Sequence, residues 1–193
     1  MSLDEMLSRR PNPAGVVRNL DAKPLEKVAI VTCMDARIAA FSVFGLRIGD
    51  AHIIRNAGGA VTSDVIRSLA ISQRKLGTRN ILLMAHTTCG MLSFTDDEFI
   101  AELAQDTGQP PTWRPGTFTD PAQHVRHGMA MLRTSPFLHA DTTIRGFVFD
   151  LDTGAVDEVT PDDVVAAAGA TASADTPAKS GTAKSGANGS SAK

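Results

Sequence analysis

The sequence predicts an α/β fold with a mostly parallel central sheet of about four strands, one antiparallel edge strand and flanking helices. Short, nearly continuous apolar runs alternate with stretches in which apolar residues recur at helical spacing. This alternation is typical of βαβ units, whose parallel strands are buried on both faces. An apolar content of 42% and a charged content of 21% are ordinary for a globular domain.

Five segments are predicted as strands. The first, 27–32 (KVAIVT), is almost wholly apolar, as expected for a strand that is covered on both faces. The others are 51–56, 80–85, 143–149 and 155–159. The last segment is short and follows a turn at 152–154, so it is expected to form the edge strand.

Three segments are predicted as helices, namely 63–76, 96–105 and 121–133. The first has apolar residues near helical spacing. Thr62 or Ser63 can cap its start, and Gly77 can end it.

The composition changes sharply near residue 165. Residues 166–193 are rich in Ala, Ser, Gly, Thr and Lys, contain no large apolar side chain, and repeat the tetrapeptide AKSG. Such a segment cannot bury enough apolar surface to offset its ordering entropy. We therefore expect one folded domain over 1–165 and a disordered tail over 166–193.

The overall charge and hydropathy argue against several classes of protein. A formal net charge of −2 gives no basic footprint for nucleic acid. No run of about 18 apolar residues is present, so no membrane span is expected. The N-terminus has charges where a secretory signal has its apolar stretch, which favours a cytoplasmic protein. With only two cysteines, a disulfide scaffold is not expected either.

Potential metal ligands follow two of the predicted strands. Cys33 comes directly after the first strand, and His86 and Cys89 come after the third. Right-handed crossovers place the carboxyl ends of parallel strands at one edge, so these side chains meet if the two strands are neighbours. Two thiolates and an imidazole suit Zn²⁺, and three protein ligands with an open fourth position indicate a catalytic site.

Asp35 and Arg37 lie beside the first ligand. The Asp35 carboxylate is two residues from Cys33, so it can reach either the metal or the Arg37 guanidinium. Arginine binds a carboxylate through paired hydrogen bonds, which would keep Asp35 off the metal and the fourth position free. In the alternative interpretation, Asp35 is the fourth ligand of a closed structural site.

Three motifs resemble those of the β-class carbonic anhydrases: CMDAR after a buried strand, RNAGG at 55–59, and HTTCGM. The match in order and context covers about residues 27–161. The resemblance implies reversible hydration of carbon dioxide to bicarbonate by zinc-bound hydroxide. It also implies Zn²⁺ as the cofactor, held by Cys33, His86 and Cys89, with Asp35 and Arg37 as the gating dyad.

The chain departs from the plant-type members of that family. Those members place a tyrosine in the active-site region, and this chain contains no tyrosine. Its short body resembles a compact actinobacterial-type branch. Some relatives with the same metal site hydrolyse COS or CS2, so a COS or CS2 hydrolase is one alternative, and a zinc-stabilised binding protein without catalysis is another.

The resemblance also implies a homodimer or a higher homo-oligomer. Two segments, 3–9 and the loop around Trp113, contain apolar residues but have no obvious place in one layer of sheet and helices. We expect them to cover a second subunit, with Trp113 as an interface anchor rather than a substrate contact.

Overall fold

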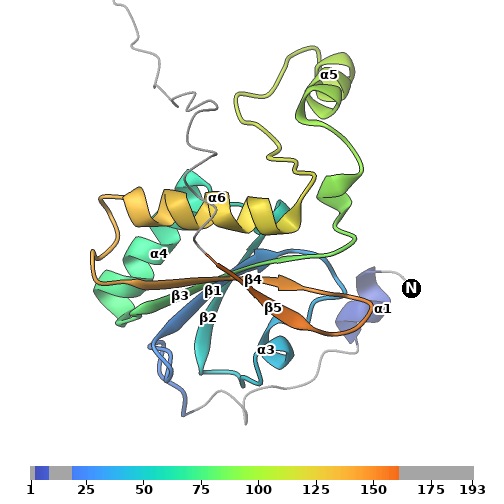
Figure 1. Ribbon diagram of the computed structural model, residues 1–193. Coiled ribbons are helices and arrows are strands. Elements are labelled where there is room, and N and C mark those ends of the chain that lie inside the picture. The colour runs from blue at the N-terminus through green and yellow to red at the C-terminus, as the bar shows by residue number, and fades with distance from the viewer. Residues whose placement is uncertain (1–2, 9–18, 161–193) are drawn as a thin grey trace, which may run out of the picture.

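The computed structural model describes residues 3–8 and 19–160, which build a five-stranded sheet in the order β2-β1-β3-β4-β5 (Figure 1). Four strands are mutually parallel, and β5 runs antiparallel to β4 at one edge. The strands are β1 (Val28–Cys33), β2 (Ala51–Asn56), β3 (Asn80–His86), β4 (Thr143–Phe149) and β5 (Val156–Val159). The predicted fold class is confirmed.

Two long helices, α4 (Ser63–Leu76) and α6 (Pro121–Thr134), cover one face of the sheet (Figure 1). Their apolar sides pack on alternate residues of β1 and β3, such as Val31 and Leu83, to form the main core. The opposite face is covered by a second cluster that includes residues of the short helix α3 (Ala40–Val43).

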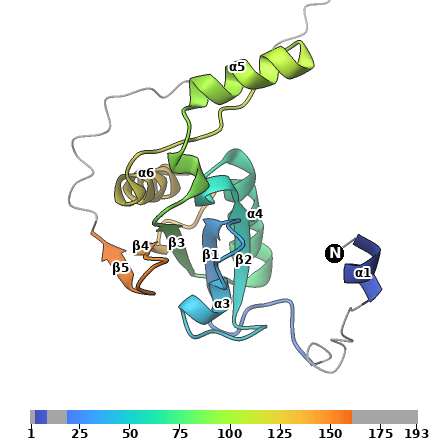
Figure 2. The same cartoon turned by 90° about the vertical axis from the view of Figure 1, so that its right-hand side faces the viewer.

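The remaining helices extend the fold beyond these layers. Helix α5 (Asp96–Thr107) buries none of its residues fully and stands away from the sheet (Figure 2). Helix α1 (Leu3–Ser8) lies near the N-terminus, and two short 3₁₀ turns, η1 (Ala57–Gly59) and η2 (Gly90–Leu92), follow β2 and β3.

The predicted segments agree closely with the observed ones. The Thr62 hydroxyl accepts a hydrogen bond from the Val65 amide and caps α4, and Gly77 ends that helix in the left-handed conformation with φ of 81°. Strand β3 is one residue longer than predicted, because His86 pairs with Phe149 of β4. The helices α1 and α3 were not predicted, since six and four residues are too few to show a helical period.

The strand order brings the predicted ligand segments together. β1 lies between β2 and β3, so the chain pairs first on one side of β1 and then on the other. Such a reversal leaves a crevice at the carboxyl ends of the strands, where open α/β sheets bind ligands. β1 ends there at Cys33, and β3 ends there at His86.

Some of the predictions fall on parts of the chain that the structure does not describe. The boundary at residue 165 and the tail 166–193 lie outside the described residues, as does the end of the segment 3–9. Within 3–8 and 19–160, no helix has the length and apolar character needed to cross a membrane.

Candidate metal centre

Cys33, His86 and Cys89 converge at the carboxyl edge of the sheet. Their possible ligand atoms all lie within 4.8 Å of one another, and the two sulfur atoms are 3.9 Å apart. With Zn–S bonds of about 2.3 Å, two thiolates of a tetrahedral site are about 3.8 Å apart. The three side chains are 0% to 4% exposed, so water does not compete for them at the surface.

The orientation of the His86 ring leaves one nitrogen atom for a ligand. Its Nδ1 donates to the Thr87 carbonyl at 2.8 Å, and a carbonyl can only accept, so Nε2 is the unprotonated nitrogen. This Nε2 is buried and has no hydrogen-bond partner. Burial lowers the pKa of His86 and favours the neutral ring. A buried acceptor without a partner costs about 1–3 kcal/mol, and a metal ion would remove this cost.

The turn between His86 and Cys89 has an unusual backbone conformation. Thr88 has φ of 51°, a value that β-branched residues rarely adopt. The preceding residue is fixed on both sides, because the Thr87 amide donates to Phe149 and its hydroxyl accepts from the Leu151 amide, each at 3.0 Å. This turn allows a ligand at the end of β3 and a second ligand three residues later to face the same point.

The Cys89 thiol needs a cation to ionise near neutral pH. Burial raises the pKa of Cys89 to about 11, so without metal this thiol is protonated. A bound cation stabilises the thiolate and releases the proton. The donor set, the spacing of the sulfur atoms and the unpartnered Nε2 all fit a zinc ion.

Asp35 and Arg37 form an ion pair beside this group. The Arg37 side chain donates to both carboxylate oxygens, with Nη2 at 2.7 Å and Nε at 2.9 Å, and the Arg37 amide donates at 2.9 Å. These bonds hold the pKa of Asp35 well below its usual range, so the carboxylate is charged throughout the physiological range. Its Oδ2 lies 3.8 Å from His86 Nε2, at the margin of the ligand group.

Arg37 also joins the two segments that supply the candidate ligands. Its Nη2 donates to the Thr88 carbonyl at 3.0 Å, so one guanidinium spans from the segment after β1 to the turn after β3. No sequence pattern predicts this contact of Thr88, because the contact depends on the backbone conformation of the turn.

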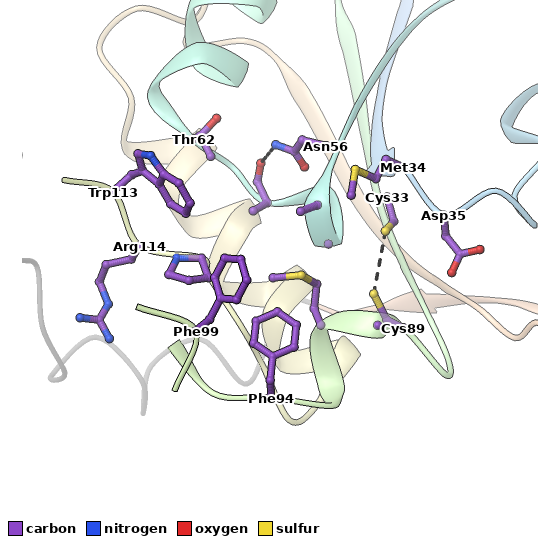
Figure 3. A pocket seen from close by; sticks show the side chains of 16 residues that line it. Cys33, Met34, Asp35, Asn56, Thr62, Cys89, Phe94, Phe99, Trp113 and Arg114 are labelled. Atoms are coloured by element: carbon purple, nitrogen blue, oxygen red, sulfur yellow. Dashed lines mark hydrogen bonds between the residues drawn. The ribbon is translucent and has the colours of Figure 1, made fainter. Parts of the chain in front are cut away.

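A cavity of about 540 Å³ adjoins Cys33, Asp35 and Cys89. Its walls are mostly apolar. Figure 3 shows the rings of Phe94, Phe99 and Trp113 on the side away from the two sulfur atoms. The lining also includes Met34, Gly58, Met91, Arg114 and Pro115.

Several of these cavity residues were not predicted. The segment from Phe94 to Pro115 shows no pattern that relates it to the ligands, because it returns to the site only through the excursion around α5. Trp113, predicted as an interface anchor, lies on the cavity wall and is 55% exposed. An interface role for Trp113 stays a prediction.

The RNAGG segment lies against the first ligand. A Cβ atom added to Gly59 would lie 2.9 Å from the Thr32 carbonyl carbon and 3.0 Å from the Cys33 amide nitrogen, and its φ is +66°. Only glycine permits this close approach of the two backbones. The segment forms one wall of the cavity through residues that include Gly58.

Comparisons with known proteins agree on one family. A family model described as carbonic anhydrase matches residues 28–156. "Beta-carbonic anhydrase 1" of Mycobacterium tuberculosis is 51% identical over 142 residues, which cover 74% of this chain and 87% of the relative. "Carbon disulfide hydrolase" of an Acidianus species is 33% identical over 148 residues, covering 64% of this chain and 72% of that protein.

A solved structure shows the same similarity in three dimensions. The carbonic anhydrase of Streptococcus mutans superposes with a TM-score of 0.73 at 44% identity, covering 83% of this chain and 99% of that chain.

We predict that metal binding releases protons and weakens as the pH falls. Because the Cys89 thiol is protonated without metal, the apparent zinc affinity should drop at least about tenfold from pH 8 to pH 7. Competition with a chelator at the two pH values measures this change. Cys89→Ser should lose the zinc, whereas His127→Gln, an exposed change on α6, should keep it. An affinity that does not change between pH 8 and 7 would contradict this account.

Proposed function

The chain belongs to the β-carbonic anhydrase family, and from this premise we propose that it catalyses the reversible hydration of carbon dioxide to bicarbonate with Zn²⁺ as its cofactor. The observation that supports this most directly is the buried Cys33–His86–Cys89 group, whose one unpartnered ring nitrogen is 3.8 Å from the carboxylate of an Asp–Arg pair. Cys33, His86 and Cys89 would hold the zinc. When bound, the ion would lower the pKa of a water molecule and so provide a nucleophile near neutral pH.

Asp35 and Arg37 act in this proposal as a gate. The Asp35 carboxylate has two possible positions, on the metal or on Arg37. Three N–H groups of Arg37 hold it in the second position, so with zinc bound by Cys33, His86 and Cys89 the carboxylate would stay off the metal and water could bind there. These hydrogen bonds from Arg37 to Asp35 are strong because hydrogen bonds to ionised groups are roughly twice as strong as neutral ones.

The cavity supports a small, uncharged substrate. Its apolar walls would accept carbon dioxide without the desolvation cost that a charged ligand would meet. The cavity borders Cys33 and Cys89 directly, so a molecule that enters it arrives beside the ligand group. Arg37 is 55% exposed and forms its ion pair with Asp35 at the outer side of the group.

Hydrolysis of CS2 or COS is the second candidate. Relatives named carbon disulfide hydrolase share 28% to 42% identity with this chain over the aligned residues, against 51% for the mycobacterial carbonic anhydrase. An apolar cavity of this size would also admit CS2. The higher identity favours carbon dioxide.

We further propose that the chain works as a homodimer or higher homo-oligomer in the cytoplasm. Strand β2 is an edge of the sheet, and apolar side chains near it or on α1 are exposed, among them Ile71, Leu3 and Met6. A second copy would bury such surface. Both cysteines are free thiols, in agreement with a reducing compartment.

The assembly can be tested in solution. We expect light scattering at micromolar concentration to give at least twice the chain mass of 20.3 kDa. A mass of one chain over the whole accessible range of concentration would contradict the proposed dimer.

The substrate can be tested by stopped-flow assays with carbon dioxide, COS and CS2 on one preparation of known zinc content. We expect a kcat/KM for carbon dioxide at least tenfold above that for either sulfur compound. The reverse order would favour the hydrolase. Activity towards none of the three, with zinc fully bound, would favour a zinc-stabilised binding protein.

The gate can be tested with Arg37→Ala. Without the guanidinium, Asp35 should move onto the metal, so kcat/KM for carbon dioxide should fall at least tenfold at pH 8 while the zinc content stays at one per chain. Arg67→Ala is the matched control, because it breaks an exposed Arg–Asp pair on α4 that has a similar N–O distance of 2.8 Å. This control should retain the wild-type rate.

The pH profile provides a second test of the gate. The wild-type rate should rise from little near pH 7 to a plateau above about pH 8, because two thiolate ligands acidify water less than three histidines do. Asp35 is ionised over this whole range, since its pKa is lowered, so the rise would report the reacting water and not Asp35. An Arg37→Ala profile identical to wild type in rate and shape would show that the pair is not a gate.

A further inference from the structure

Arg55 of β2 reaches across to the segment that joins Cys33 to Asp35. Its Nε donates to the Cys33 carbonyl at 2.9 Å, and its Nη2 donates to the Asp35 carbonyl at 2.6 Å. Between these two carbonyls, the Met34 amide donates to the Asn56 carbonyl at 2.8 Å. Two adjacent residues of β2 therefore bind the whole segment from the first metal ligand to the carboxylate of the dyad.

This arrangement begins where the strand ladder ends. The pairing of β1 with β2 finishes at Cys33 and Asn56, and the chain then turns into η1 (Figure 3 shows Asn56 close to Met34 and Cys33). Beyond this point the Arg55 side chain supplies the donors for the two carbonyls. A guanidinium presents its N–H groups in a rigid fork, so it can hold two carbonyls at a fixed separation, whereas a lysine ammonium cannot.

Asp35 is consequently held at two places by two arginines. Arg55 binds its main-chain carbonyl, and Arg37 binds its carboxylate. The carboxylate Oδ2 is only 3.8 Å from His86 Nε2, so the position of the Asp35 backbone bears directly on how close the carboxylate lies to the candidate metal ligands.

We propose that Arg55 is a positioning residue of the gate, which holds the Cys33–Asp35 segment where the Asp35 carboxylate pairs with Arg37 and stays off the metal. The proposal rests on the proposed role of Asp35 and Arg37. Without Arg55 the segment is free to move, and the charge of the metal draws the carboxylate towards the closed position.

A purely structural role for Arg55 makes a different prediction. If Arg55 only stabilised the edge of the sheet, its loss would lower the stability and leave the coordination of the metal unchanged. Arg74 is a matched control for this role, because its Nε and Nη2 also donate to a backbone carbonyl, that of Phe137, at 3.2 and 2.9 Å. Neither Arg74 nor Phe137 lines the cavity beside the ligand group.

The experiment compares full-length wild type, Arg55→Met, Arg55→Lys, Arg74→Met and Arg37→Ala, each with zinc and with Co²⁺ in its place. The visible absorption of Co²⁺ reports its ligands directly, without any turnover. We expect Arg55→Met to bind one Co²⁺ per chain with a spectrum shifted from wild type towards Arg37→Ala. Its zinc form should have a kcat/KM for carbon dioxide at least threefold lower at pH 7. The Co²⁺ spectrum and the kcat/KM of Arg55→Lys should lie between those of wild type and Arg55→Met, since one ammonium can bond only one carbonyl well.

Arg74→Met should keep the wild-type spectrum and rate, even where its thermal unfolding shifts. A wild-type spectrum and rate in Arg55→Met would overturn the proposal. Loss of Co²⁺ binding would overturn it as well, because Arg55 would then hold the Cys33 ligand and not the gate. If Arg55→Met does not fold, the same criteria apply to Arg55→Lys.

The Arg37→Ala variant tests the proposed gate independently of Arg55. If Arg37→Ala has the spectrum and rate of wild type, the proposed gate fails, and the positioning role of Arg55 fails with it. A closed spectrum in Arg37→Ala together with an unchanged Arg55→Met rejects the role of Arg55 alone.

Discussion

The structure of this site depends on a burial problem that the protein alone does not solve. Two thiols whose sulfur atoms are 3.9 Å apart lie within 4.8 Å of a ring nitrogen that has no hydrogen-bond partner, and all three groups are nearly out of contact with water. Buried polar groups are normally satisfied by protein or water, and a cation that accepts all three donors is the simplest resolution. The fold sets up this demand because β1 and β3 are neighbours and both end at the same edge.

Hydrogen bonds from two arginines connect the segments around the Cys33–His86–Cys89 group, and both cysteines also belong to a buried apolar cluster. Arg37 connects Asp35 to the Thr88 carbonyl and so links the two ligand-bearing segments. Arg55 of β2 donates to the carbonyls of Cys33 and Asp35. Thr88 keeps a positive φ of 51° within this network. Backbone strain of this kind persists where the surrounding contacts enforce it, and such positions cluster at functional sites.

The cavity bears on which small substrate the site could accept. Relatives named carbonic anhydrase and carbon disulfide hydrolase both align with this chain. An apolar space lies beside the Cys33–His86–Cys89 group. In this chain that space is bordered by Phe94, Phe99 and Trp113, which come from around the excursion that carries α5.

The sequence by itself was sufficient for those features that depend on local pattern. The strands and long helices follow from the period of their apolar residues, and the common sheet edge of Cys33 and His86 follows from the handedness of βαβ crossovers. That β1 and β3 are neighbours was decided by the tertiary structure. The candidate ligands were predicted from the chemistry of thiol and imidazole groups.

Only the tertiary structure could decide the contacts between segments that share no pattern. It showed His86 as the last residue of a strand, with Nδ1 bonded to Thr87 and Nε2 left over. It also brought Trp113 to the cavity and Arg55 to two backbone carbonyls. An arginine that binds carbonyl oxygens leaves no trace in the sequence, because every residue offers a carbonyl and only the path of the chain selects which one is reached.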